Sequence, residues 1–218
     1  IEPTTALDLI DGVASDLETV AFETMSELLQ YAYKVAGTVG LMMCRVLEVD
    51  DPRATPFAID LGVAMQLTNI ARDIREDALN GRRYIPATWL AGASTKDIAN
   101  PNASLKPRLQ AAAKRLIKLA ELYYESASNG FGFLPGRSRF AILIAARVYR
   151  QIGLKLKRRD FATWRGRTIV GTAEKIMVTG AATATYLTEL RLHRCSVEHN
   201  SELHVSLQEF AGTNQLVK

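Results

Sequence analysis

The residues best suited to chemistry lie four positions apart in one stretch of the chain. Asn69, Asp73 and Asp77 fall within residues 55–79, whose apolar residues recur at helical spacing. At 100° per residue, each step of four turns a helix by only about 40°, so the three side chains project from one stripe. Mg²⁺ takes oxygen ligands and is commonly shared between one or two carboxylates and a phosphate. The stripe therefore predicts a site for a magnesium-bound diphosphate.

The alternative interpretation of this stripe is a solvated helix face. Charged residues at helical spacing are common on surfaces, and two carboxylates at i and i+4 repel by roughly 0.2–0.5 kcal/mol. The surrounding positions, however, are apolar and predict a largely buried helix; they include Val63, Met65, Leu67, Ile70 and Ile74. Because a buried carboxylate needs a partner, these neighbours favour the metal site.

A second feature is a pair of glycines inside another predicted helix. Gly37 and Gly40 each cost about 1 kcal/mol relative to alanine in a helix, so something must approach this backbone closely. Tight helix packing and a slot for an apolar ligand chain explain the glycines equally well. In the second case Tyr31 and Val35 would line the slot.

A third feature is a run of basic residues between positions 155 and 167. Such a cluster could meet nucleic acid or an anionic membrane face. The nearby aromatic residues Phe161 and Trp164 are too few for a base-stacking platform, so we favour a solvated surface and expect no nucleic-acid partner. The histidines show no ligand spacing, and we assign no role to His193, His199 or His204.

The helices that must position these residues are indicated by caps and breaks. The predicted helices are one that starts at Thr4 or Thr5 and includes Leu17, followed by residues 24–49, 55–79, 104–129, 137–158 and 172–192. Thr24 and Glu27 form a capping box at the second start. Residues 80–104 lack a sustained period and predict a long loop with a short turn at 86–90.

The composition is that of a folded helical protein. The 218 residues include 27 Lys and Arg against 23 Asp and Glu, with 48% hydrophobic residues and two cysteines. These values exclude a disordered, collagen-like or disulfide-stapled chain. Alanine is abundant and β-branched runs are short, which favours an all-α fold. With no apolar run long enough to span a bilayer and no paired cysteine spacing, we expect a cytoplasmic location.

Two strings of the chain resemble a known family. Residues 31–43 read YAYKVAGTVGLMM, and residues 66–86 read QLTNIARDIREDALNGRRYIP. Both are similar to the phytoene and squalene synthase family, and within it most of all to the bacterial phytoene synthases. The similarity runs from the first predicted helix to about Val178.

The resemblance implies an all-α isoprenoid synthase helical bundle that uses Mg²⁺, with Mn²⁺ as an alternative. By resemblance, Asn69, Asp73 and Asp77 bind the metal and one diphosphate, and Tyr31 lies at the reacting carbons as a catalytic residue together with the two aspartates. The other substrate-binding positions that the resemblance implies are Val35, Val39, Gly40, Ala58, Leu61, Met65, Gln66, Arg72, Tyr149 and Arg167. Arg165 is the alternative to Arg167 if the alignment slips.

The implied activity is the head-to-head condensation of two molecules of geranylgeranyl diphosphate to phytoene, through a cyclopropyl diphosphate, in carotenoid biosynthesis. That prenyltransferase reaction needs no NADPH. One alternative is a squalene or dehydrosqualene type of synthase, of which the squalene type would use NADPH. Another is a non-catalytic helical protein whose pocket serves as an assembly or lipid-contact surface. The hydrocarbon product leaves peripheral membrane contact open.

The resemblance also shows a departure from the family pattern. The first aspartate-rich motif of the family precedes the region where this sequence begins, and Asp8, Asp11 and Asp16 match a downstream family segment instead. We therefore expect the sequence to be the C-terminal part of a synthase, an N-terminally incomplete bundle that is inactive alone.

Two expectations concern the folded chain. Residues 1–194 should form the helical domain, and residues 195–218 a polar, loosely held tail. The three residues of the stripe should face one cavity, with Tyr31 across it.

Overall fold

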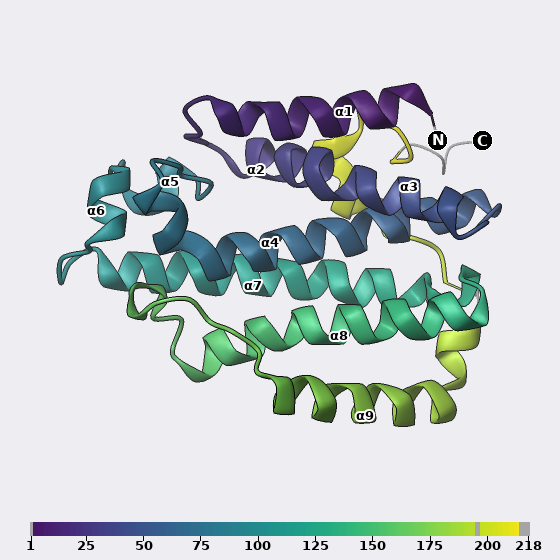
Figure 1. The fold of residues 1–218 in the computed structure, drawn as a ribbon. Coiled ribbons are helices and arrows are strands. Elements are labelled where there is room, and N and C mark those ends of the chain that lie inside the picture. Colours follow the sequence, from purple (N-terminus) through teal and green to yellow (C-terminus); the bar gives the residue numbers. More distant parts are fainter. Residues whose placement is uncertain (1, 195–196, 214–218) are drawn as a thin grey trace.

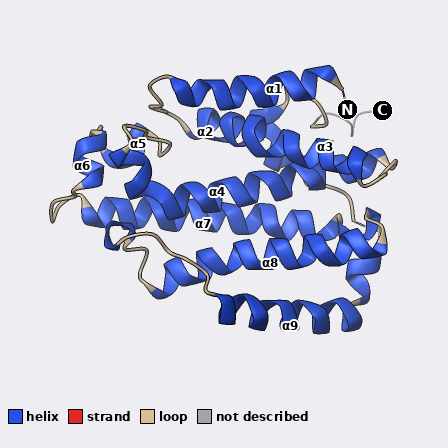
Figure 2. Ribbon diagram, in the orientation of Figure 1, coloured by secondary structure: helices blue, strands red, loops and turns tan. Residues whose placement is uncertain are grey.

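The computed structural model describes residues 2–194 and 197–213, and within them every regular element is a helix (Figure 2). The α-helices are α1 (Pro3–Ala14), α2 (Met25–Ala32), α3 (Thr38–Val46), α4 (Thr55–Leu79), α5 (Ala87–Leu90), α6 (Thr95–Ala99), α7 (Lys106–Asn129), α8 (Gly136–Arg158) and α9 (Thr172–Thr188). The predicted all-α class is confirmed.

The long helices lie in successive layers, with α4 and α7 in the middle (Figure 1). Helices α1, α2 and α3 cover one side of this pair, and α8 and α9 cover the other. The short helices α5 and α6 lie at the end of the bundle where α4 terminates. Helix α4 therefore contacts both halves of the molecule.

The α4–α7 pair forms the core because both helices carry apolar residues at helical spacing. In α7, Leu109, Ala113, Leu116 and Ala120 are at most 1% exposed, and they face a matching stripe on α4 that includes Ile59, Val63 and Leu67. Full burial of such a leucine or isoleucine stabilises the fold by about 1.5–3 kcal/mol. This packing holds α4 rigidly and so fixes the direction of its polar stripe.

The predicted helix over residues 24–49 is interrupted by a π-helical turn. The capping box of Thr24 and Glu27 is present, and α2 continues into a π-helical turn at Tyr33–Gly37 before α3 ends at Val46. A Cβ on Gly40 would lie 2.2 Å from the carbonyl oxygen of Ala58, so α3 and α4 pack backbone against backbone. The tight-packing explanation of this glycine is therefore confirmed.

The structure corrects the prediction at two other elements. Residues 80–104 contain not only the expected turn, seen as α5, but also α6, which begins with a capping box between Ser94 and Asp97. The apolar stripe of the predicted first helix faces outward: Ile10 of α1 is 63% exposed, and Leu17, in the 3-10 turn Ser15–Leu17 that follows α1, is 88% exposed. Gly12 of α1, by contrast, is buried against Lys34. Gly12 is buried because its small size lets α1 approach the chain at Lys34.

The expectation of a loosely held tail is wrong for residues 197–213. Leu207 in this segment is fully buried. The hydroxyl of Tyr33 donates to the carbonyl of Ala211 at 2.8 Å, and that of Tyr123 donates to the carbonyl of Leu203 at 2.7 Å. Buried hydroxyls on two helices thus need backbone acceptors, and this segment supplies them. Residues 195–196 and 214–218 of the predicted tail lie outside the described residues.

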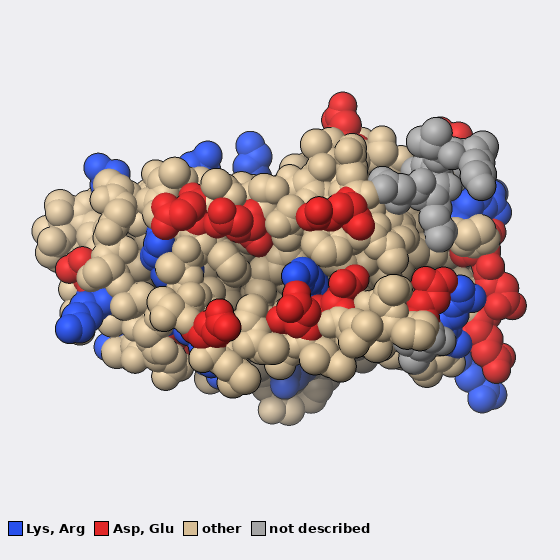
Figure 3. All heavy atoms as spheres, turned by 90° about the horizontal axis from the view of Figure 1, so that it is seen from above, with Lys and Arg blue, Asp and Glu red and all other residues tan. Residues whose placement is uncertain are grey.

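The surface carries mixed charge. On the face seen from above α1, acidic and basic side chains are interspersed, and several of them lie side by side (Figure 3). Within the basic run, Lys155 pairs with Glu174 at 2.7 Å, and Arg159 donates to the carbonyl of Gly166 and the hydroxyl of Thr168. These two cations therefore hold the fold together. No helix in the described ranges has both the length and the apolarity to cross a bilayer.

Candidate functional site

An apolar cavity of about 410 Å³ lies between α3, α4, α7 and α8. Its walls include nine of the site residues expected from the sequence, namely Val35, Val39, Gly40, Ala58, Leu61, Met65, Gln66, Asn69 and Tyr149. Gly40, which makes the close contact with α4, lines the cavity, and Gly62 of α4 lines it as well. Tight packing and an apolar slot, offered above as alternatives, therefore both occur here.

The polar part of the cavity wall is formed by two amides of α4. The side-chain amide of Asn69 donates to Oε1 of Gln66 at 3.5 Å, which is a long contact. The Oδ1 atom of Asn69 is buried and has no hydrogen-bond partner among the described residues. A buried acceptor without a donor costs about 1–3 kcal/mol, so this oxygen is suited to a cation or to the donor of a ligand.

Asp73, one turn further along α4, is held by two arginines. Arg72 makes a two-point contact with its carboxylate, and Nε of Arg167 donates to Oδ1 at 2.9 Å. The hydrogen bond from Arg72 to Asp73 raises the pKa of Arg72. Arg167, rather than the alternative Arg165, is the arginine that reaches the stripe. Two guanidinium groups therefore lie beside the central carboxylate.

Asp77 is the most perturbed carboxylate of the stripe. Burial raises its pKa to about 7, the charge of Asp73 adds to this effect, and Arg82 opposes it. Asp77 lines a small depression together with Arg82 and Tyr84. With a pKa of about 7 this carboxyl is only partly ionised at neutral pH, and a nearby cation would favour its charged form.

Tyr31 lies at the Asp77 end of the stripe. Its hydroxyl donates to Asp16 at 3.0 Å, and the hydroxyl of Tyr84 donates to the same carboxylate at 2.8 Å. The two rings stack with centroids 5.0 Å apart. Burial raises the pKa of Tyr31 far above its usual value and that of Tyr84 to about 12, so both phenols stay protonated.

The expectation that the stripe and Tyr31 share one cavity is wrong. Asn69 lines the cavity, whereas Asp73, Asp77 and Tyr31 do not. From Asn69 to Asp77 the helix turns by about 80° and rises by about 12 Å, which carries the last aspartate past the cavity to the segment around Tyr84. The structure thus forms a continuous track, from an apolar cavity through Asn69 and Asp73 to Asp77, with Tyr31 at its far end.

Three residues of this track were not singled out from the sequence. Arg82 and Tyr84 lie in the string that carries the family resemblance, and that string was the available signal for them. Asp16 has no comparable local signal, because its two tyrosine partners are 15 and 68 positions away.

Comparisons with known proteins show what this chain is similar to. A family model described as squalene/phytoene synthase matches residues 1–174. The 15-cis-phytoene synthase of Enterobacter agglomerans is 43% identical over 190 residues, which cover 86% of this chain and 64% of that protein. The phytoene synthase of Pseudescherichia vulneris is 44% identical over 182 residues, covering 84% and 59%. The chain therefore spans somewhat less than two thirds of the length of these curated relatives.

The fold is also similar to that of a solved synthase. A crystal structure of a dehydrosqualene synthase in complex with ligand superposes with a TM-score of 0.71 at 30% sequence identity, covering 84% of this chain and 64% of that one. The helical bundle of this chain is thus an isoprenoid synthase fold.

Proposed function

This chain belongs to the squalene/phytoene synthase family, and from that membership we propose that it acts in the head-to-head condensation of two geranylgeranyl diphosphates to phytoene. One observation carries the proposal: a polar, partly anionic stripe begins at the wall of an apolar cavity. A prenyl diphosphate has the matching form, because it joins a charged head to a long hydrocarbon chain.

The stripe fits a divalent cation. Asn69, Asp73 and Asp77 offer hard oxygen donors, the type that Mg²⁺ prefers. The buried Oδ1 of Asn69 lacks a partner, and Asp77 has a pKa of about 7, so a nearby positive charge would relieve both. When bound, the metal would stabilise negative charge on the diphosphate leaving group as the allylic C–O bond ionises.

The arginines of the site are suited to bind the diphosphate. A guanidinium group presents paired N–H donors that match phosphate oxygens and stays charged at any working pH. Arg72 is mostly buried and already oriented by Asp73, whereas Arg167 is half exposed and reaches the same carboxylate from another segment. We infer that Arg72 is preorganised and that Arg167 closes onto the ligand.

The cavity walls would protect the reacting hydrocarbon. Apolar residues from four helices exclude water, which would otherwise trap a carbocation as an alcohol. Tyr31 cannot act alone as a base, because its raised pKa keeps the phenol protonated and its proton is donated to Asp16. We therefore assign Tyr31 and Asp16 a joint positioning role at the Asp77 end of the stripe.

Binding is the primary test of this proposal. The chain is titrated with a thiolo analogue of geranylgeranyl diphosphate, which ionises poorly, in the presence and absence of Mg²⁺. We expect Mg²⁺-dependent binding that Asp73→Ala abolishes. The exposed Asp50→Asn, outside the cavity and stripe, is the matched control and should bind as the unsubstituted chain does. Binding that ignores Mg²⁺, or that survives Asp73→Ala, would contradict the proposal.

The product distinguishes the remaining candidates. Similarity to a solved dehydrosqualene synthase favours a second candidate, a synthase of that type acting on a shorter prenyl diphosphate. Turnover assays use geranylgeranyl and farnesyl diphosphates, each with and without NADPH, and the part of a curated relative that this chain does not cover is supplied in trans. Chromatography of the hydrocarbons then separates the two candidates. Phytoene from the longer substrate without NADPH supports the proposal. The absence of both binding and product would favour a non-catalytic helical protein.

A further inference from the structure

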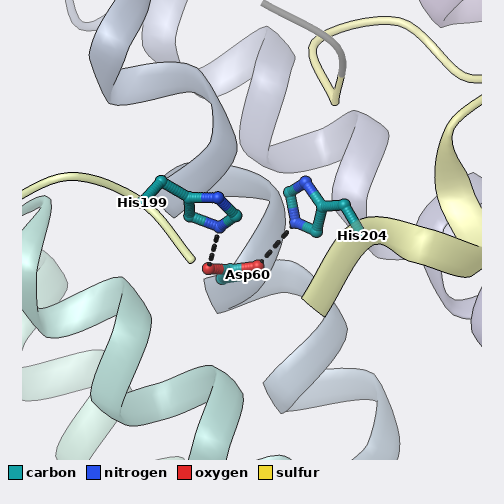
Figure 4. A group of neighbouring side chains, drawn as sticks. All are labelled: Asp60, His199 and His204. Carbon is teal, nitrogen blue, oxygen red and sulfur yellow. Dashed lines mark hydrogen bonds and ion pairs between the residues drawn. The ribbon is translucent and has the colours of Figure 1, made fainter. Parts of the chain in front are cut away.

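A second group of buried polar side chains lies away from the cavity and the stripe. Asp60 of α4 accepts hydrogen bonds from Nε2 of His199 at 2.8 Å and from Nε2 of His204 at 2.7 Å, one on each carboxylate oxygen (Figure 4). All three residues are buried, and Asp60 is completely inaccessible. The two histidines come from the C-terminal segment, about 140 positions from Asp60. None of the three lines the cavity.

The charge of this group is poorly balanced. Asp60 is completely buried, so only side chains packed against its carboxylate can balance that charge. No lysine or arginine within the described ranges pairs with Asp60. With both imidazoles neutral, a buried negative charge remains, and burying an uncompensated charge is costly.

His204 is also incompletely satisfied. The residue is only 1% exposed, and its buried Nδ1 atom has no hydrogen-bond partner among residues 2–194 and 197–213. The two imidazole rings lie 4.4 Å apart between centroids, and Phe57 meets His199 edge to face. The surroundings are therefore apolar, and they provide no second polar group for His204.

The donor atoms suit a transition-metal ion. One ligand atom from each of Asp60, His199 and His204 can be chosen so that all lie within 4.8 Å of one another. Two imidazole nitrogens and a carboxylate oxygen are donors of Zn²⁺ and related first-row ions, whereas Mg²⁺ selects oxygen. A bound dication would take the place of the two imidazole protons that now point at Asp60. Each displaced proton can move to Nδ1, and that of His204 is not committed elsewhere.

We propose that Asp60, His199 and His204 form a structural binding site for Zn²⁺ or a related first-row dication, which fastens the C-terminal segment to α4. The three side chains are buried and none of them lines the apolar cavity, which leaves no room for a substrate at the ion and so favours a structural role. The ion would act together with the contacts that Tyr33 and Tyr123 make to the same segment. Because a ligand that binds only the folded state stabilises it, the site would contribute directly to stability.

Metal binding to the full chain tests this proposal. The protein is stripped with a chelator and titrated with Co²⁺, whose visible absorption reports imidazole and carboxylate coordination, and its zinc content is measured after reconstitution. We expect one ion per chain. His204→Gln, which keeps an N–H group that can reach Asp60 but loses the imidazole, should weaken binding by more than about 100-fold.

Two control variants separate this site from others. His193→Ala removes an exposed histidine outside the cluster and should leave the Co²⁺ spectrum unchanged. The double variant Asp73→Asn with Asp77→Asn removes the carboxylates proposed for Mg²⁺ and should also keep it. Circular dichroism confirms that each variant is folded, and chelation should lower the melting temperature of the unsubstituted protein but not that of His204→Gln.

Three results would overturn the proposal. The first is a folded, metal-free protein that takes up no Co²⁺ at millimolar concentration. The second is uptake that His204→Gln leaves intact. The third is uptake that disappears only in the Asp73 and Asp77 double variant. Each would mean that Asp60 and the two histidines are held by hydrogen bonds alone.

Discussion

Asp77 holds its proton more tightly than an ordinary aspartate, and this predicts how the metal-free protein responds to pH. Its pKa is raised from 3.8 to about 7 by burial and by Asp73. The folded state therefore binds more protons than the unfolded state between these values, and stability is present below pH 3.8 and lost as the pH rises through about 7. Asp77→Asn should remove this loss, so that the variant is more stable than the unsubstituted chain at pH 8 by about 1 kcal/mol or more.

Urea unfolding at pH 5 and pH 8, in the presence of a chelator, measures this effect. The advantage of Asp77→Asn should shrink at pH 5, where the native carboxyl is already protonated. Added Mg²⁺ should reduce the advantage at pH 8, because it stabilises only the ionised carboxylate. An advantage that is equal at both pH values would contradict the assignment of the raised pKa to Asp77.

Asp16 is expected to hold two tyrosines in place. Asp16→Ala leaves the hydroxyls of Tyr31 and Tyr84 without their carboxylate acceptor, which should cost about 1–3 kcal/mol. Tyr31→Phe should then cost much less in the Asp16→Ala background than in the unsubstituted chain. Thermal unfolding of the four proteins of this double-mutant cycle gives the coupling energy. Additive costs would mean that the two side chains act independently.

At the scale of single residues, the sequence predicts what depends on local spacing. The stripe of Asn69, Asp73 and Asp77 was found from its period alone, because helix geometry relates residues four apart. The partners of Asp16 and Asp60 are set by the tertiary fold, and no local pattern marks them. The same limit applies to the cavity, whose walls come from segments far apart in the sequence, such as Val39, Met65 and Tyr149.

Helix α4 and the π-helical turn Tyr33–Gly37 meet through their backbones, and this contact predicts strong intolerance of a methyl group. A Cβ on Gly62 would lie 2.2 Å from the carbonyl oxygen of Ala36. Backbone atoms cannot move aside as a side chain can, so Gly62→Ala should destabilise the fold by about 3 kcal/mol or more. Because Gly62 lines the cavity, the same variant should also weaken binding of the thiolo analogue.

Gly180 supplies the matched control for this experiment. It lies inside α9, and nothing would lie within 4 Å of an added Cβ. Gly180→Ala should therefore raise stability by about 0.5–1 kcal/mol, since alanine loses less backbone freedom in a helix. Chemical denaturation of both variants tests the pair. Equal effects of the two substitutions would mean that the close approach of the π-helical turn to α4 does not limit Gly62.

At the scale of elements, caps and breaks predicted the long helices well. The boundaries of α4, α7 and α8 follow the Pro, Asn and Gly signals that the sequence displays. The short α6 was missed because Ser94 and Asp97 were read as part of a loop, although their spacing is that of a capping box. The π-helical turn has no signal of its own, and the outward stripe of α1 shows that period alone does not decide which face is buried.

Helix α4 contacts the core, the candidate site and the C-terminal segment. One face packs on α7, another carries the polar stripe, a third lines the cavity, and Asp60 holds the C-terminal segment. The polar composition of residues 195–218 predicts a domain boundary after residue 194. The structure shows instead that polar residues can be core residues when a buried carboxylate, such as Asp60, requires them.

This attachment can be measured by a thermodynamic cycle between Asp60 and the segment. Asp60→Asn in the full chain leaves two buried imidazoles facing an amide, and breaking a buried pair of this kind costs about 3–5 kcal/mol. In a chain that ends after residue 194, Asp60 has lost both histidines, so the same substitution should cost almost nothing. The truncation itself should lower stability, since it uncovers the site of Leu207 and removes the ring of Phe210, which stacks 4.5 Å from Tyr33.

Urea unfolding of the four proteins gives the coupling. An equal cost of Asp60→Asn in both chain lengths would mean that Asp60 does not hold the segment, and a truncated chain as stable as the full one would establish residues 1–194 as an independent domain.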